Sequence, residues 1–239
     1  MTGILLYDSI GSNYLMRKQR ITNPGPIKRG RFHSLDEWFR ATFKGFLDTL
    51  AGFFNRIGIQ PNTMTIMGLV GTIAGSVLLG FRHLTIGGFI ILISGIFDAL
   101  DGSMARLRNE PTRFGAFVDS VSDRYSDLSI FAGLMAYFIQ KQDWLACGVL
   151  YAAAVGTVMV SYVRARAESL SYTAKVGILS RVERYLVIVP GLVFNIPLVS
   201  VWIIAIFANF TAFQRIWHVR KQALGLIQPD QTTPVEKLK

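Results

Sequence analysis

The fold is decided by the stretch from Asp98 to Asp123, which reads DALDGSMARLRNEPTRFGAFVDSVSD. It carries four aspartates in two pairs, Asp98 with Asp101 and Asp119 with Asp123. At helical pitch, spacings of three and four residues place both members of a pair on one face of a helix. Each pair lies in or beside a long apolar run, so we predict two helices joined by the polar turn at residues 106–114. All four carboxylates can then point at one spot.

Carboxylates at this density predict bound cations. Four of them cannot all be ionised in one poorly solvated place unless cations neutralise them. Carboxylate oxygens favour hard ions such as Mg²⁺, Mn²⁺ or Ca²⁺. Arg106 is placed to reach a phosphate, and the small residues Gly102 and Ala105 let a ligand approach the backbone closely. This combination predicts a diphosphate substrate and phosphoryl-type chemistry. The alternative, that the aspartates cap helices or lie on a solvated face, is disfavoured by the apolar flanks at residues 91–97 and 128–138.

The spacing of these residues resembles the signature of the CDP-alcohol phosphotransferase (CDP-alcohol phosphatidyltransferase) family. The resemblance extends from about Pro61 to about Arg215. The residues that match the signature are Asp98, Asp101, Gly102, Ala105, Arg106, Gly115, Asp119 and Asp123. The resemblance implies an enzyme that transfers the phosphatidyl group of CDP-diacylglycerol, or of a related CDP-linked lipid, to an alcohol and releases CMP.

The resemblance also implies roles for individual residues. Two Mg²⁺ or Mn²⁺ ions would be bound by Asp98, Asp101 and Asp119, with Asp123 at the second ion. Asp123 would also act as the general base on the acceptor hydroxyl. The CDP-lipid would be held by the small and polar residues of the signature and by a helix start that precedes it. These CDP-lipid residues are Pro61, Asn62, Thr65, Gly102, Ala105, Arg106 and Gly115.

The composition indicates a membrane protein. Of the 239 residues, 51% are hydrophobic and gather in long blocks, and the net charge is +10 with a pI of about 10.0. The basic residues fall between the apolar blocks, which favours membrane lipids and anionic substrates over nucleic acid as partners. We therefore predict an all-α integral membrane protein that crosses the cell membrane several times.

The chain divides into four segments. We predict a basic cytoplasmic arm at residues 1–34, an amphipathic juxtamembrane helix at 35–58, a catalytic domain of six transmembrane helices at 61–217 and a cytoplasmic tail at 218–239. The six spans are placed near residues 63–81, 84–107, 114–139, 144–170, 184–195 with extensions on both sides, and 198–217. The fifth is the hardest to place, because Pro190 and Gly191 interrupt it.

Charge asymmetry predicts the orientation. Basic residues crowd the N-terminal arm, the turn between the aspartate pairs, the segment between the fourth and fifth spans, and the tail, whereas the opposite loops contain only Arg82 and Lys141. The positive-inside rule then places both termini and the active site on the cytoplasmic side. Aspartates within spans normally face a polar cavity, so we predict an inward-facing cleft near the cytoplasmic leaflet.

A second polar group brackets the connection between the fourth and fifth spans. Ser161 and Arg164 share a helical face, and so do Arg181 and Arg184, so these side chains could hold the phosphate of an acceptor. In the alternative interpretation, the arginines mark the cytoplasmic boundary of the membrane. The pattern resembles the branch of the family that makes phosphatidylinositol phosphate from inositol 1-phosphate, although Arg164 stands where that branch often has lysine.

Three other interpretations stay open at this point. Phosphatidylglycerophosphate synthases share the core signature and use glycerol 3-phosphate as the acceptor. A divalent-cation transporter would also carry intramembrane aspartates, but it would need polar residues across the full depth of the membrane. A non-catalytic scaffold of the same fold would not need all four aspartates. A homodimer is an expectation from the family alone.

Overall fold

The computed structural model describes residues 35–108 and 112–227 of the chain. Within these residues every regular element is a helix. The segments predicted as an N-terminal arm and as the last part of the C-terminal tail lie outside the described residues. The helices are α2 (Leu35–Arg56), α3 (Pro61–Gly80), α4 (Leu84–Leu107), α5 (Arg113–Gln140), α6 (Trp144–Ser169), α7 (Arg181–Val193) and α8 (Pro197–Ala223).

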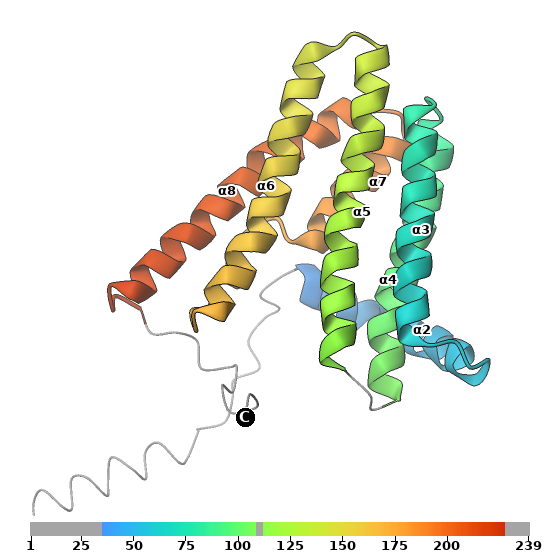
Figure 1. Ribbon diagram of the computed structural model, residues 1–239, viewed down its shortest axis with the longest axis vertical. Helices are drawn as coiled ribbons and strands as arrows, with labels where there is room; N and C mark the ends of the chain where they lie inside the picture. The colour runs from blue at the N-terminus through green and yellow to red at the C-terminus, as the bar shows by residue number, and fades with distance from the viewer. Residues whose placement is uncertain (1–34, 109–111, 228–239) are drawn as a thin grey trace, which may run out of the picture.

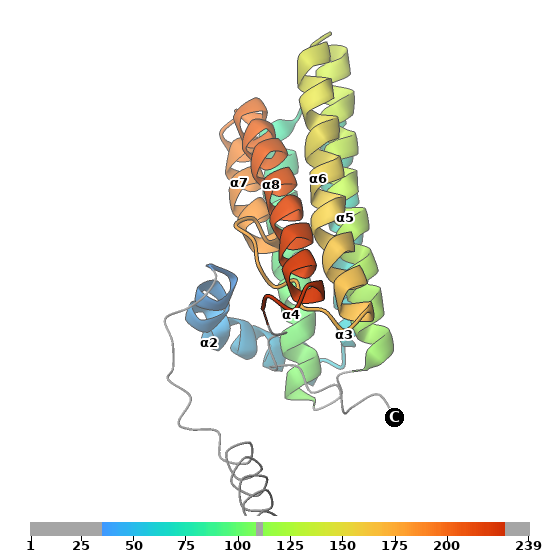
Figure 2. The same ribbon diagram turned by 90° about the vertical axis from the view of Figure 1, so that its left-hand side faces the viewer.

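Six of the helices form a bundle in which the chain runs alternately up and down, and α2 lies across one end (Figures 1 and 2). Helix α3 packs on α4 and α5, α6 packs on α5 and α8, and α7 packs on α4 and α8. These contacts close a ring of six helices. Helices α4 and α5 are consecutive in the chain, yet each packs mainly on α3 and not on the other. Their facing sides are therefore available for a site.

Small residues let α4 and α5 approach α3 closely. A Cβ atom added at Gly87 would lie 2.7 Å from the carbonyl oxygen of Gly75, and one added at Gly75 would lie 2.9 Å from the carbonyl oxygen of Gly87. A Cβ atom at Gly133 would press against the backbone of Ser76 in the same way. Such small-residue contacts are typical of helix packing within a membrane. They fix the distance between α4 and α5, which carry the aspartates.

The outside of the bundle is apolar. Large side chains with more than two fifths of their surface exposed, among them Val70, Phe89 and Tyr151, cover helices that also have apolar inner faces. Helices α3, α4, α6 and α8 are long and apolar enough to cross a membrane by length and composition. The prediction of an all-helical integral membrane protein is confirmed at this level. Helices α5 and α7 do not meet the same criteria, so the number of spans stays a prediction.

Helix α7 is shorter than the predicted fifth span. Its 13 residues rise about 1.5 Å each, which gives roughly 20 Å against a hydrocarbon core of about 30 Å. At its end Asn195 adopts a positive φ of 60°, and α8 begins two residues later with a proline at its first position. Pro190 lies inside the helix and does not break it.

Helix α2 is attached to the ends of α3 and α4. Ala51 of α2 is buried in a small cluster with Met64 and Leu100. Arg108, the residue after α4, donates hydrogen bonds to Asn55 Oδ1 at 2.8 Å and to the carbonyl oxygen of residue 59 at 2.7 Å. These contacts hold α2 against the end of the bundle at which the C-terminal end of α4 lies.

Candidate active site

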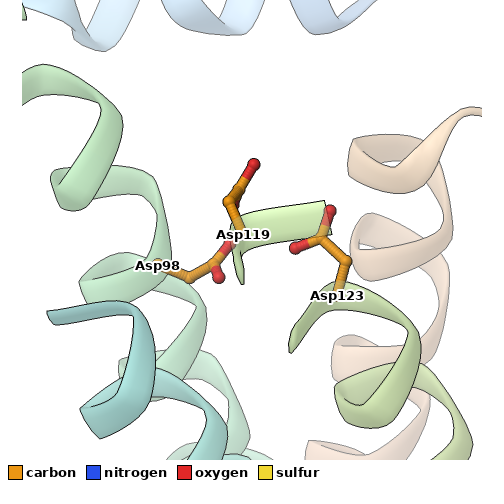
Figure 3. Close-up of side chains that lie close together, drawn as sticks. All are labelled: Asp98, Asp119 and Asp123. Atoms are coloured by element: carbon orange, nitrogen blue, oxygen red, sulfur yellow. The ribbon is translucent and has the colours of Figure 1, made fainter. Parts of the chain in front are cut away.

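Three of the four predicted aspartates come together between α4 and α5. Asp98 extends from α4, and Asp119 and Asp123 extend from successive turns of α5. One carboxylate oxygen of each lies within 4.8 Å of the others (Figure 3). The three residues are only partly exposed. The grouping follows from the sequence pattern, because α4 and α5 flank α3 and turn their polar faces to each other.

Arg181, at the start of α7, bridges two of these aspartates. Its Nη1 atom donates a hydrogen bond to Asp98 Oδ2 at 2.6 Å and lies 2.5 Å from Asp123 Oδ1. The second contact is an ion pair to the buried Oδ1 atom of Asp123. The ring of Tyr185, one turn along α7, lies 5.8 Å from the Arg181 guanidinium.

The donor set fits a hard divalent cation. Three carboxylates supply only oxygen atoms, which is the ligand type that Mg²⁺ and Mn²⁺ prefer. Arg181 and Arg124 form ion pairs with Asp98 and Asp123, but the three carboxylates still lie close together in a partly buried place, where a cation lowers their mutual repulsion. The residues present therefore fit a metal site.

Asp101 has a different environment from the other three aspartates. It is buried on α4, and its Oδ2 atom accepts a hydrogen bond of 2.5 Å from Thr65 Oγ1 on α3. Near the same end of α3, Asn62 lies against the start of α5, where a Cβ atom added at Gly115 would be 3.3 Å from Asn62 Oδ1. Thr112 caps α5 by accepting a 2.9 Å hydrogen bond from the Gly115 amide. The beginning of α3 is thus next to both aspartate-bearing helices.

The remaining signature residues lie on the last turns of α4. Arg106 donates a 2.8 Å hydrogen bond to Ser103 Oγ, and its Nη1 atom would lie 3.4 Å from a Cβ atom at Gly102. Its guanidinium is therefore folded along its own helix. Ala105 is half-buried on the same stretch, and Pro61 occupies the first turn of α3. Nothing in these contacts assigns a ligand, so their roles as CDP-lipid residues stay predictions.

The second polar group is divided between two environments. Arg184 is buried and donates a 2.8 Å hydrogen bond to Asp127 Oδ2, one turn beyond Asp123 on α5. Arg164 lies on α6 and forms an exposed ion pair with Glu168 at 3.0 Å. Ser161 is half-buried one turn before Arg164. Of the four predicted acceptor residues, only Arg181 contacts the aspartate group directly in the described interactions.

Some residues near the site gave no clear signal in the sequence. The Arg184–Asp127 pair joins residues 57 positions apart, so only the packing of α5 and α7 reveals it. Gly95 makes room for Tyr185, because a Cβ atom there would lie 2.8 Å from the Tyr185 ring. Arg215 is buried and donates hydrogen bonds to the carbonyl oxygens of residues 160 and 176. It thereby fixes the segment between α6 and α7, a role that its position in the sequence did not indicate.

Comparison with known proteins identifies the family. A family model described as CDP-alcohol phosphatidyltransferase matches residues 59–214, which include all the aspartates and arginines of the site. The chain belongs to the CDP-alcohol phosphatidyltransferase family. The resemblance found in the sequence is therefore confirmed, and an enzyme of this family is supported over a cation transporter.

Two named relatives indicate which branch of the family the chain resembles. The chain is 33% identical to phosphatidylinositol phosphate synthase from Mycobacteroides abscessus over 76% of this chain and 86% of the relative. It is also 33% identical to archaetidylinositol phosphate synthase from Pyrococcus horikoshii, over 77% of this chain and 95% of the relative. Both relatives are named for inositol phosphate products. They support the inositol phosphate branch over the glycerol phosphate branch.

Solved structures share the fold. The crystal structure of Mycobacterium tuberculosis phosphatidylinositol phosphate synthase with CDP-DAG bound matches with a TM-score of 0.67 and 30% identity, covering 72% of this chain and 92% of that chain. A second structure of the same protein, in complex with manganese and citrate, matches with a TM-score of 0.68 and 30% identity. The match covers 73% of this chain and 88% of that chain. A relative whose structure contains bound manganese thus has the same fold.

Proposed function

We propose that this phosphatidyltransferase transfers the phosphatidyl group of CDP-diacylglycerol, or of a related CDP-lipid, to inositol 1-phosphate, giving phosphatidylinositol phosphate and CMP. The observation that carries the proposal is the group of Asp98, Asp119 and Asp123, with Arg181 paired to Asp98 and Asp123. Carboxylates that can hold cations for a diphosphate lie there beside a guanidinium that can hold a second phosphate. A diphosphate donor and a phosphorylated polyol need this combination.

The metal ligands in this proposal are Asp98, Asp101, Asp119 and Asp123, with Mg²⁺ or Mn²⁺ as the ions and two ions per site. When bound, such ions polarise the diphosphate and stabilise the charge on the departing CMP. The three grouped carboxylates support the assignment directly. Asp101 lies one turn from Asp98, and the hydroxyl of Thr65 holds its carboxylate in place.

Asp123 is the proposed general base. It accepts the proton of the acceptor hydroxyl as that oxygen forms a bond to the lipid-bearing phosphorus, while the bond from this phosphorus to the oxygen of CMP breaks. The transfer is direct and needs no nucleophilic side chain. Asp123 suits the role because its Oδ1 atom lies 2.5 Å from Nη1 of Arg181, which can bring the acceptor phosphate to this side of the site.

The CDP-lipid is proposed to bind where α3, α4 and α5 meet. The contact of Asn62 with the start of α5 and the bond between Thr65 and Asp101 bring the sequence-predicted residues to one region. Small residues there allow close approach of a diphosphate to the backbone. The residues assigned to this subsite are Pro61, Asn62, Thr65, Gly102, Ala105, Arg106 and Gly115.

The acceptor phosphate is proposed to bind between α6, α7 and α8. Ser161, Arg164, Arg181 and Arg184 are the assigned residues. Arg215 supports the assignment, because its hydrogen bonds to the carbonyl oxygens of residues 160 and 176 hold α6 and α8 to the segment that leads into Arg181. Guanidinium groups are the side chains that best match a doubly charged phosphate.

We also propose the membrane arrangement expected from the sequence. All six bundle helices cross the membrane, α2 lies in the interface as an amphipathic helix, and both termini and the active site face the cytoplasm. The proposed segments are the arm at residues 1–34, the juxtamembrane helix at 35–58, the catalytic domain at 61–217 and the tail at 218–239, in a protein that forms a homodimer. The apolar outer surface and the charge asymmetry support this arrangement.

The test of the reaction is CMP release by the purified protein with CDP-diacylglycerol and Mg²⁺. Inositol 1-phosphate, glycerol 3-phosphate, free inositol and no acceptor are compared side by side. The proposal requires release with inositol 1-phosphate and much less with the others. Equal or greater release with glycerol 3-phosphate would reassign the branch, and release with free inositol would remove the phosphate pocket.

The orientation is tested by cysteine labelling in whole cells. The single native cysteine is replaced first, as Cys147→Ala. Lys141→Cys should then react with a membrane-impermeant maleimide from outside, whereas Arg220→Cys should react only after the cells are opened. The reverse pattern would invert the topology.

A further inference from the structure

A second concave surface lies away from the aspartate site. It is formed by the outer face of α8 near its C-terminal end and by the segment at residues 176–178 that precedes α7, and it is an open hollow of about 710 Å³. We name it the α8 groove. Its lining residues are Val176, Gly177, Ile178, Phe210, Phe213, Gln214, Trp217, His218 and Lys221. None of them belongs to the group of aspartates and arginines described above.

One end of the α8 groove is apolar and aromatic. Phe210, Phe213 and Trp217 follow one another at steps of three and four residues, so they form a stripe along one face of α8. The rings of Phe213 and Trp217 stack with their centroids 6.3 Å apart, and all three side chains are exposed. Aromatic rings on the outside of a membrane-spanning helix are positioned to contact acyl chains.

The other end of the α8 groove is basic. His218 and Lys221 line it, and the guanidinium of Arg220 lies 5.3 Å from the centre of the Trp217 ring. The described lining residues include no acidic side chain. The surface therefore changes from apolar to cationic within the last turns of α8, which is the arrangement that complements an amphiphile with a negative headgroup.

From this complementarity we propose that the α8 groove binds an anionic phospholipid. The headgroup phosphate is held by Lys221 and Arg220, with His218 as a further hydrogen-bond donor, and an acyl chain lies along Phe210 and Phe213. A zwitterionic phospholipid offers the same chain but no net charge, so it binds more weakly. The proposal does not depend on the transferase reaction.

The position of the α8 groove connects it with the active site. The segment that forms its second wall is fixed to α8 by the 2.9 Å hydrogen bond from Arg215 Nε to the carbonyl oxygen of Val176. The amide of Leu179 donates to Thr211 Oγ1 at 3.1 Å. The same segment continues directly into Arg181 at the start of α7. A lipid in the groove therefore packs against the segment that positions this arginine.

The experiment uses quenching of Trp217 fluorescence in the purified full-length protein. The other three tryptophans are replaced by phenylalanine, as Trp38→Phe, Trp144→Phe and Trp202→Phe. Phosphatidylglycerol or phosphatidylcholine with brominated acyl chains is then titrated into the detergent solution. EDTA is present and CDP-lipid is absent, so the measurement is independent of metal and of CMP release. Each basic side chain contributes about fivefold to anionic lipid binding, so half-maximal quenching should need about 25-fold less phosphatidylglycerol than phosphatidylcholine.

Two variants locate the effect. Lys221→Gln together with Arg220→Gln should abolish the preference for phosphatidylglycerol. Lys141→Gln is the matched control. This lysine also lies over an aromatic ring, 4.5 Å from the centre of the Tyr137 ring, but at the opposite end of the bundle. The control should leave the preference for phosphatidylglycerol unchanged. All three side chains are exposed, so the variants should fold, which their thermal unfolding checks.

The proposal is overturned if both lipids quench Trp217 equally, or if the preference survives in the double variant. Loss of the preference in Lys141→Gln as well would also overturn it, because the effect would then come from total charge and not from the α8 groove. A negative result in this experiment would not contradict the proposed transferase reaction. A failure to release CMP would likewise not contradict lipid binding in the α8 groove.

Discussion

The buried ion pair between Arg184 and Asp127 allows the sharpest test of how the interior of this bundle is stabilised. The two side chains are joined by a 2.8 Å hydrogen bond and are only 5% and 10% exposed. Removing one partner of such a pair leaves an uncompensated buried charge, which destabilises a protein by about 3–5 kcal/mol. Arg184→Met should therefore lower the free energy of unfolding by that amount, since Asp127 keeps its place without a partner.

Thermal unfolding in detergent measures the effect. For a chain of this size, 1 kcal/mol corresponds to about 2–4 °C in Tm, so Arg184→Met should unfold roughly 6–20 °C below the parent. The matched control is Arg164→Met, which breaks the exposed pair with Glu168, whose side chains are each 49% exposed. An exposed pair at this helical spacing is worth only about 0.3–0.5 kcal/mol. The control should therefore lie within about 2 °C of the parent.

The double variant Arg184→Met with Asp127→Leu decides between a buried charge effect and simple loss of packing. Replacing both partners by apolar side chains is often neutral or stabilising, so the double variant should recover most of the lost stability. The reasoning is refuted if the double variant is less stable than Arg184→Met alone, or if Arg184→Met and Arg164→Met unfold at the same temperature.

Further predictions concern the reaction and the packing. Asp123→Asn should reduce CMP release by about 10²–10⁴-fold and leave CDP-lipid binding intact; undiminished turnover would exclude it as the base. Chelation of divalent ions should abolish CMP release, and added Mn²⁺ should restore it. Arg181→Ala should tighten Mn²⁺ binding while raising the KM for inositol 1-phosphate more than that for the CDP-lipid. Gly87→Val should lower the free energy of unfolding by about 1–3 kcal/mol, because the new side chain would press on α3. Gly148→Val should not, because no atom lies within 4 Å of a Cβ added at that position. Equal Tm values for the two variants would contradict the packing argument.

Hydrophobic periodicity was enough to locate the helices. The predicted second span at residues 84–107 has the same bounds as α4, and the first, third and fourth spans lie within two residues of their helices. Helix α8 continues six residues beyond the predicted end of the sixth span, and α7 is shorter than a full span. The two helices that lack a sufficiently apolar window are α5 and α7. They carry Asp119, Asp123 and Arg181, so their polarity comes from the site residues themselves. The hydropathy signal for a membrane span is thus weakest in the helices that carry the active-site residues.

The spacing of the aspartates predicted a common site, and helix geometry explains why Asp101 differs from the others. At about 100° per residue, a step of three turns a side chain roughly 60° back from the starting direction, and a step of four turns it roughly 40° forward. Asp123 therefore stays near the direction of Asp119, whereas Asp101 turns toward α3. On α3, the hydroxyl of Thr65 donates a hydrogen bond to the Asp101 carboxylate. The spacing alone did not identify this partner.

Pairings between distant helices could not be predicted. Arg181 reaches Asp98 over 83 positions of sequence, and Arg184 reaches Asp127 over 57. Both contacts depend on how α7 closes the ring between α4 and α8. The sequence indicated that these arginines share a helical face, but it assigned them together to an acceptor phosphate. The structure separates them, with Arg181 at the aspartate group and Arg184 one turn deeper.

The position of Arg181 links metal binding to acceptor binding. Its guanidinium holds Asp98 and Asp123 through contacts of 2.6 and 2.5 Å, so it competes with a cation for the same oxygen atoms. A charge-assisted hydrogen bond contributes about 1.5–3 kcal/mol, so removing the competitor as Arg181→Ala should tighten Mn²⁺ binding at least about tenfold, as measured by electron paramagnetic resonance of the free ion. In the parent, bound cations would instead release the guanidinium, which then has an acceptor phosphate as its nearest anionic partner. Acceptor affinity should therefore rise when Mn²⁺ is present and lose this dependence in Arg181→Ala. Unchanged or weaker Mn²⁺ binding in Arg181→Ala would show that Arg181 supports the metal site and does not compete with it.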